Sequence, residues 1–207
     1  LGNGSQLFRI PKVADLPSIT PRLATPNDPN YRPYKRDPET LAREWAIPGM
    51  EGLRHRVGGL EKADGEGHLS TDPDNHKTMT WNRQEKVNRV ANYIPEQEVM
   101  GDPDGDLLVI GWGGTAGSLT KAVEEMNAEG KKVAYTHFNY ISPLPKNTGD
   151  ILRKYKKIVV CELNNGQFLG YLRTQFPECP MHQYNKVMGL PFEVGELKDE
   201  FNKILGE

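Results

Sequence analysis

Cysteine is scarce in this chain, and its scarcity limits the metal chemistry that the chain can support. The 207 residues include two cysteines, Cys161 and Cys179, which do not form a C-x-x-C pair. A typical iron–sulfur cluster needs four thiolates, so the sequence predicts no such cluster and no metal site here. Cys161 ends an apolar run, and we expect a small buried residue there rather than a nucleophile.

Two other features are also missing, a surplus of basic residues and a long apolar run. The formal net charge is −2, whereas nucleic-acid-binding domains usually present a basic face. No apolar run approaches the roughly 18 residues that a membrane span needs, and no signal peptide is evident. With its thiols expected to be reduced, the chain is predicted to be cytoplasmic and to bind neither nucleic acid nor membrane.

The most informative pattern is a strand followed by a glycine-rich turn and a helix. Leu107 to Ile110 form a continuous aliphatic run, as a strand covered on both faces requires. The turn that follows contains Gly111, Gly113, Gly114 and Thr115, and it leads into helical spacing of apolar residues. Because a helix start can hold an anion, these four residues are a candidate anion-binding or interface turn.

A dinucleotide site would need an acidic residue after the next strand. Gly111, Gly113 and Ala116 fit G-x-G-x-x-A, but the strand expected over residues 132–138 ends in Phe138-Asn139. The acid that would bind the ribose hydroxyl is therefore missing. We interpret the turn as one that packs a helix onto a sheet, rather than as a site for NAD or FAD.

Strands and helices then alternate to the end of the chain. Further strands are expected over residues 157–161 and 181–188, and helices over 150–155, 167–176 and 193–205. Residues 105–207 are thus predicted to form a three-layer α/β domain on a mostly parallel sheet.

The first half of the chain has a different character. Residues 7–74 carry most of the prolines and show no long periodic window, yet they include apolar anchors such as Phe8, Trp45 and Ile47. We interpret residues 1–76 as an extended inter-domain arm and loop that lies across other protein. Residues 77–104 are interpreted as a helix and connector.

The one helix expected in the first half covers residues 78–93. Its predicted buried side consists of Met79, Val87, Val90 and Ala91.

A Gly-rich, charged loop at residues 54–76 is the first candidate for a direct role in an active site. Arg54, His55, Arg56, Asp72 and Asp74 are placed to act as a lid, since such loops position charged groups over sites built elsewhere. The alternative is structural, because residues 62–67 resemble a hairpin tip and Asp72 a helix N-cap.

A second candidate is the set of polar residues after the strand at 157–161. Glu162, Asn164 and Asn165 are expected at the carboxyl edge of the sheet, where open α/β folds often bind ligands. In the alternative interpretation Asn165 or Gly166 caps the following helix and the edge serves as a subunit contact.

Several segments together resemble the C-terminal region of the alpha subunit of 2-oxoacid:ferredoxin oxidoreductases, most closely the 2-oxoglutarate type. The order and spacing of these segments carry the resemblance, which covers nearly the whole chain: Trp45-Ala46-Ile47-Pro48-Gly49, His55-Arg56-Val57-Gly58-Gly59-Leu60-Glu61, Asp72-Pro73-Asp74-Asn75-His76, Gly111-Trp112-Gly113-Gly114-Thr115 and Glu162-Leu163-Asn164-Asn165-Gly166-Gln167. Leu1 to Ser5 resemble the end of that family's pyrimidine-binding domain, so we expect a piece that begins just past it.

The resemblance implies a thiamine diphosphate enzyme that oxidises a 2-oxoacid, reduces ferredoxin and acylates coenzyme A. Thiamine diphosphate, Mg and an iron–sulfur cluster are then expected in the full complex, on the beta subunit and the preceding alpha domain, and none in this fragment. Residues 105–207 resemble the transketolase C-terminal domain and would serve packing, contact with the beta subunit and self-association. No catalytic residue is expected here, and the fragment alone is predicted to be inactive. A stand-alone nucleotide or small-molecule binding module remains the alternative.

Overall fold

The structure is a computed structural model, and it describes residues 10–206. These residues fall into two compact units, one covering Ile10–Tyr93 and the other starting at Ile94. Each unit is described by itself below. The expectations for Leu1 to Ser5 and for Phe8 lie outside the described residues.

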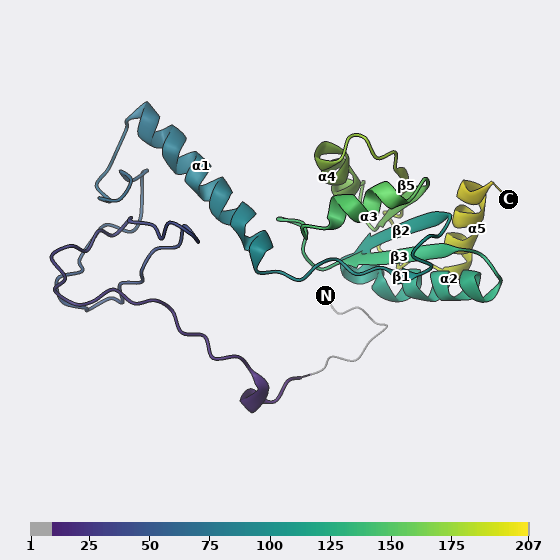
Figure 1. Cartoon of the computed structure of the whole chain (residues 1–207), viewed down its shortest axis with the longest axis horizontal. Coiled ribbons are helices and arrows are strands. Elements are labelled where there is room, and N and C mark those ends of the chain that lie inside the picture. Colours follow the sequence, from purple (N-terminus) through teal and green to yellow (C-terminus); the bar gives the residue numbers. More distant parts are fainter. Residues whose placement is uncertain (1–9, 207) are drawn as a thin grey trace. The chain divides into compact units, whose positions relative to one another are not determined.

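The second unit is built on a five-stranded, mostly parallel sheet with the order β1-β3-β2-β4-β5 (Figure 1). The strands are β1 (Met100–Gly101), β2 (Leu107–Trp112), β3 (Val133–Phe138), β4 (Ile158–Glu162) and β5 (His182–Asn185). β2, β3, β4 and β5 pair in parallel, whereas the two-residue β1 pairs antiparallel with β3.

Helices cover both faces of this sheet, so the unit has three layers (Figure 1). Alternate residues of each central strand enter different cores, because successive side chains of a strand point to opposite faces. Leu108 and Ile110 pack with α3 (Thr148–Lys154) and α4 (Gln167–Gln175). Leu107 and Val109 pack with α2 (Ala116–Ala128) and α5 (Val194–Leu205). The predicted three-layer α/β fold is therefore confirmed.

Two details of the second unit differ from the sequence prediction. β1 was not predicted, since two residues are too short to produce an apolar pattern. β5 ends at Asn185 instead of continuing to Met188, and Val187 and Met188 lie in the following loop with 62% and 70% of their surface exposed.

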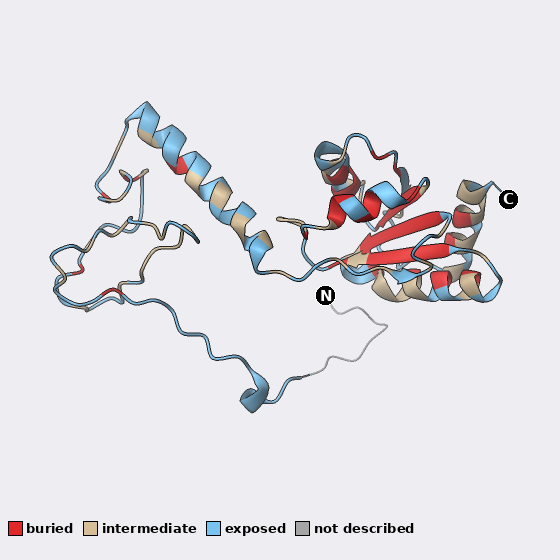
Figure 2. Ribbon diagram, viewed as in Figure 1, coloured by how far each residue is buried: buried red, intermediate tan, exposed pale blue. Residues whose placement is uncertain are grey.

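The first unit buries few apolar side chains, in agreement with its lack of periodicity. Only Ala24, Leu53 and Met79 are buried apolar residues among the described residues before Ile94. Figure 2 shows the contrast between the buried strands of the sheet and the mostly exposed chain that precedes α1. Isolated bridges hold the loops together, for example the one between Leu23 and Trp45.

The helix α1 of the first unit spans Pro73–Arg89 and continues into the short 3₁₀ helix η2 (Val90–Asn92). It begins five residues before the predicted start, because Asp72 caps it by accepting a hydrogen bond from the Asn75 N–H, and Pro73 is at its first position. The predicted buried side was mostly wrong. Met79 is buried, but Val87 and Val90 are 40% and 44% exposed.

Candidate functional site

The carboxyl ends of β2 and β4 are where an open α/β sheet of this topology would bind a ligand. The chain leaves β2 toward β3 on one side and later returns to β4 on the other, so the connections diverge between these two strands. The predicted turn Gly111 to Thr115 follows β2, and Glu162 ends β4. The structure thus brings both predicted groups of the second unit to one edge of the sheet.

Glu162 occupies this edge with a fully buried carboxylate. The carboxylate accepts hydrogen bonds from the backbone N–H groups of Phe168 and Leu169, at 2.9 Å each, near the start of α4. It also accepts from the indole Nε1 of Trp112 at 3.1 Å and from the side-chain amide of Asn164 at 2.9 Å. The Glu162 carboxylate therefore accepts the hydrogen bonds that the free N–H groups at the start of α4 could otherwise donate to a bound phosphate or carboxylate.

The two asparagines of this edge also have structural partners. Asn164 accepts from the backbone N–H groups of Gly166 and Gln167 through its Oδ1. Asn165 contributes its backbone carbonyl, which accepts a hydrogen bond from Gln183 at 3.5 Å. Gly166 is the N-cap residue of α4, as the alternative interpretation allowed, and the side chains that accept hydrogen bonds from the first N–H groups of the helix are those of Glu162 and Asn164.

The turn after β2 is fixed in a similar way by its own residues. The Thr115 hydroxyl accepts a hydrogen bond from the Trp112 N–H and donates one to the Trp112 carbonyl. Gly111 is required by space, because a Cβ there would come within 2.3 Å of Leu119 and 2.7 Å of the Thr115 hydroxyl. Gly113 has φ +58 and Gly114 is exposed; a Cβ on either would meet nothing within 4 Å.

Cys161, which precedes Glu162 in β4, is fully buried, as predicted. Burial raises the pKa of its thiol well above its ordinary value, so the thiol stays protonated and is a poor nucleophile. Among residues 10–206 no group of three or more His, Cys, Asp or Glu side chains is arranged to hold a metal ion.

The loop at residues 54–76 in the first unit contains a hairpin. Ala63 donates its N–H to the His68 carbonyl, and Ser70 donates to the Glu61 carbonyl. Lys62 is only 4% exposed, and its ammonium donates to the backbone carbonyls of Gly58 and Leu60. Residues 62–67 thus lie at the end of a hairpin, but the interpretation as an exposed tip is only partly correct, since Lys62 and Gly67 are buried.

The predicted lid residues divide between two places in this loop. Asp72 and Asp74 lie at the start of α1, where Asp72 is the N-cap. Arg54, His55 and Arg56 lie on a stretch without helix or strand that follows the buried Leu53. His55 is half-buried with its Nδ1 2.9 Å from the Leu53 carbonyl, whereas Arg54 and Arg56 are exposed.

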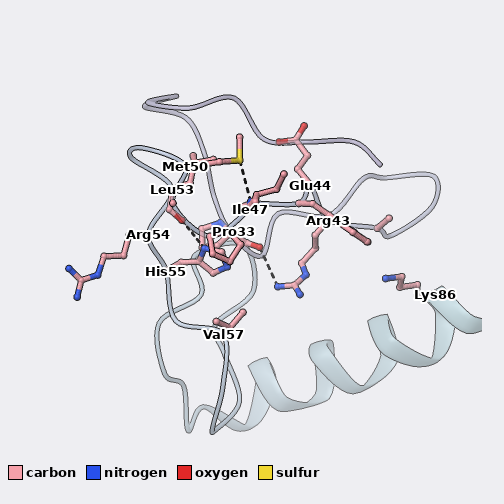
Figure 3. Close-up of a pocket in the computed structure, with 15 residues that line it drawn as sticks. Pro33, Arg43, Glu44, Ile47, Met50, Leu53, Arg54, His55, Val57 and Lys86 are labelled. Atoms are coloured by element: carbon pink, nitrogen blue, oxygen red, sulfur yellow. Dashed lines mark hydrogen bonds between the residues drawn. The ribbon is translucent and has the colours of Figure 1, made fainter. Parts of the chain in front are cut away.

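A cavity of about 760 Å³ lies beside this stretch (Figure 3). Arg54 and His55 line it together with residues 42–50, and Lys86 reaches it from α1. Neither the cavity nor the pairing of Trp112 with Glu162 was predicted from the sequence. The apolar residues among the prolines near Trp45 were the signal that could have indicated the cavity.

Comparison with known proteins places these features in a family. Residues 105–191 match the family described as "Pyruvate:ferredoxin oxidoreductase core domain II". The 2-oxoglutarate oxidoreductase subunit KorA of Mycobacterium tuberculosis is 44% identical over 199 residues, which are 95% of this chain and 30% of that protein. Subunit alpha of 2-oxoacid:ferredoxin oxidoreductase 1 from Aeropyrum pernix is 30% identical over 140 residues, 64% of this chain and 21% of that protein.

The chain is homologous to a part of the alpha subunits of the 2-oxoacid:ferredoxin oxidoreductases. A solved structure described as the 2-oxoglutarate:ferredoxin oxidoreductase from Magnetococcus marinus, with 2-oxoglutarate, coenzyme A and succinyl-CoA bound, matches with a TM-score of 0.81 and 26% identity. The match covers 94% of this chain and 34% of that one. The chain thus spans between about a fifth and about a third of the length of these relatives, and the predicted resemblance is confirmed.

Proposed function

We propose that this chain is the C-terminal part of the alpha subunit of a 2-oxoglutarate:ferredoxin oxidoreductase, and that its α/β unit serves packing and subunit assembly. The observation that carries the assembly role is the buried Glu162 carboxylate, which fills the sheet edge where a substrate or nucleotide would otherwise bind. The 44% identity to a 2-oxoglutarate oxidoreductase subunit supports the choice of substrate. The same filled edge argues against a stand-alone nucleotide-binding module.

The proposal assigns thiamine diphosphate, Mg and the iron–sulfur cluster to other parts of the complex. The residues of this chain do not fit a cluster, because its two cysteines are both buried and a cluster needs four accessible thiolates. The unpaired cysteines also support a cytoplasmic location, where thiols stay reduced. No helix among residues 10–206 is long and apolar enough to cross a membrane.

In the assembled enzyme we assign the role of an active-site lid to Arg54, His55 and Arg56. Neither arginine makes an ion pair with a carboxylate among residues 10–206, so both guanidinium groups are available to an anionic substrate such as coenzyme A or a 2-oxoacid. Asp72 and Asp74 are better explained by the start of α1.

The test is to produce the full-length subunit that contains this chain together with its beta subunit. The purified complex should reduce ferredoxin with 2-oxoglutarate in a reaction that requires coenzyme A, and should use pyruvate poorly. A full-length subunit that associates with no partner, or a complex that is inactive with every 2-oxoacid tested, would contradict the proposal.

A further inference from the structure

The cavity beside residues 43–57 is formed by loops that the first unit itself holds in place. The Trp45 N–H donates to the Arg22 carbonyl and the Ala24 N–H to the Trp45 carbonyl, both at 2.9 Å. The turn from Ile47 to Met50 is closed by a backbone hydrogen bond of 3.0 Å. The side chains around the cavity therefore project from a defined backbone.

Several apolar side chains around this cavity are exposed to water. Trp45 is 64% exposed, Ile47 49% and Val57 76%. A site for a small metabolite is normally enclosed, so that its apolar lining and most of the ligand are shielded from water. Exposed Trp and Arg side chains gathered on one surface are instead typical of the central part of a protein–protein interface.

The charges around the cavity are mostly positive. Figure 3 shows Lys86 projecting from α1 and Arg54 pointing outward from the loop. Within the described part of the chain, neither of these cations is paired with a carboxylate. Glu44 is the one acidic residue that lines the cavity, and it is already paired with Arg22 at 3.1 Å. An occupant with carboxylates would complement this surface.

We propose that this cavity docks a segment of the partner subunit, in which an apolar side chain is flanked by carboxylates. The apolar side chain would enter between Trp45 and Ile47, and a flanking carboxylate would meet Lys86, which leaves Arg54 available to the substrate. Docking there would hold the stretch that carries Arg54 and Arg56 against the partner. The proposal rests on the proposed function, since it assumes that the chain works as a subunit.

The experiment measures the affinity of the full-length alpha subunit for its beta subunit by titration. Trp45→Ala removes the aromatic anchor, and Trp81→Ala is its matched control, because Trp81 is equally exposed at 64% but does not line the cavity. Lys86→Glu reverses a charge at the cavity, and Lys77→Glu makes the same change on α1 away from it. Thermal unfolding of each variant checks that it folds.

We expect Trp45→Ala and Lys86→Glu each to raise the dissociation constant at least about tenfold, and both control variants to change it less than about twofold. If the wild-type subunits associate and the cavity variants behave like their controls, the docking site is wrong but the proposed function stands. If the cavity variants assemble normally and instead raise the KM for coenzyme A or 2-oxoglutarate, the occupant is a small anion and the docking proposal is overturned. If the wild-type subunits do not associate, the proposed function itself fails.

Discussion

At the residue scale, Glu162 combines a charged side chain with complete burial. A carboxylate without partners would be costly in the interior, but this one accepts four hydrogen bonds, two of them from the backbone at the start of α4. Its role is therefore to stabilise the junction between β4 and α4.

Replacement of Glu162 by glutamine should destabilise the chain. The amide would direct a donor at groups that are themselves donors, and we expect a loss of about 1–3 kcal/mol in the free energy of unfolding. Urea denaturation measures this loss, with the exposed Glu124→Gln as the control, which should stay within about 0.5 kcal/mol of the wild type. Equal stability of the two variants would contradict the assigned role.

Gly111 and Gly114 provide a matched pair within one turn. A methyl group on Gly111 would overlap Leu119 and Thr115, whereas one on Gly114 would meet nothing within 4 Å. Gly111→Ala should therefore lower the free energy of unfolding by about 1–3 kcal/mol, and Gly114→Ala should change it little. Thermal or urea unfolding distinguishes them, and a stable Gly111→Ala would show that the packing of α2 on β2 is looser than described.

At the scale of elements, periodicity decided what could be predicted. The apolar runs of β2 and β4 and the amphipathic α5 could be identified because burial on two faces or one face leaves a direct pattern in the sequence. The first unit has no such pattern, so the hairpin around Lys62 was recognised only by its turn residues. The partners of Glu162 could not be predicted, because Trp112 lies fifty residues away in the sequence.

The stretch from Arg54 to Arg56 is the element whose role in turnover can be tested directly. Changing all three residues to uncharged ones in the assembled enzyme should lower kcat/KM for coenzyme A or the 2-oxoacid by at least about tenfold, since charge-assisted hydrogen bonds to the substrate would be lost. A control variant with Lys146 and Lys154 neutralised loses two positive charges, as many as the loss of Arg54 and Arg56 removes, from exposed positions in the other unit.

Subunit association and thermal stability of the triple variant are measured alongside its kinetics. If the stretch is a lid, the turnover of the triple variant should fall far more than its subunit association or its thermal stability. A triple variant that assembles normally and keeps wild-type kinetics for both substrates would show that the stretch is only a connector.

At the scale of the whole molecule, the chain covers about a third of the Mycobacterium tuberculosis and Magnetococcus marinus relatives, and the proposed function assigns the cofactors that oxidise a 2-oxoacid to other parts of the complex. The purified 207-residue chain, supplied with 2-oxoglutarate, coenzyme A and an electron acceptor, should therefore show no turnover above the background rate. The full-length alpha subunit with its beta subunit, assayed under the same conditions, is the positive control. Turnover by the chain alone would contradict the assignment of the cofactors to other parts of the complex.

The carboxylate at the sheet edge also has a thermodynamic consequence. A ligand that binds only the native state stabilises it in proportion to the logarithm of its concentration, so a protein with an open site becomes more stable as the metabolite accumulates. Here the group that fills the edge is covalently part of the chain, and its effective concentration never varies. The backbone N–H groups of Phe168 and Leu169 therefore give the folding equilibrium of the α/β unit no dependence on the nucleotide and phosphate levels around it.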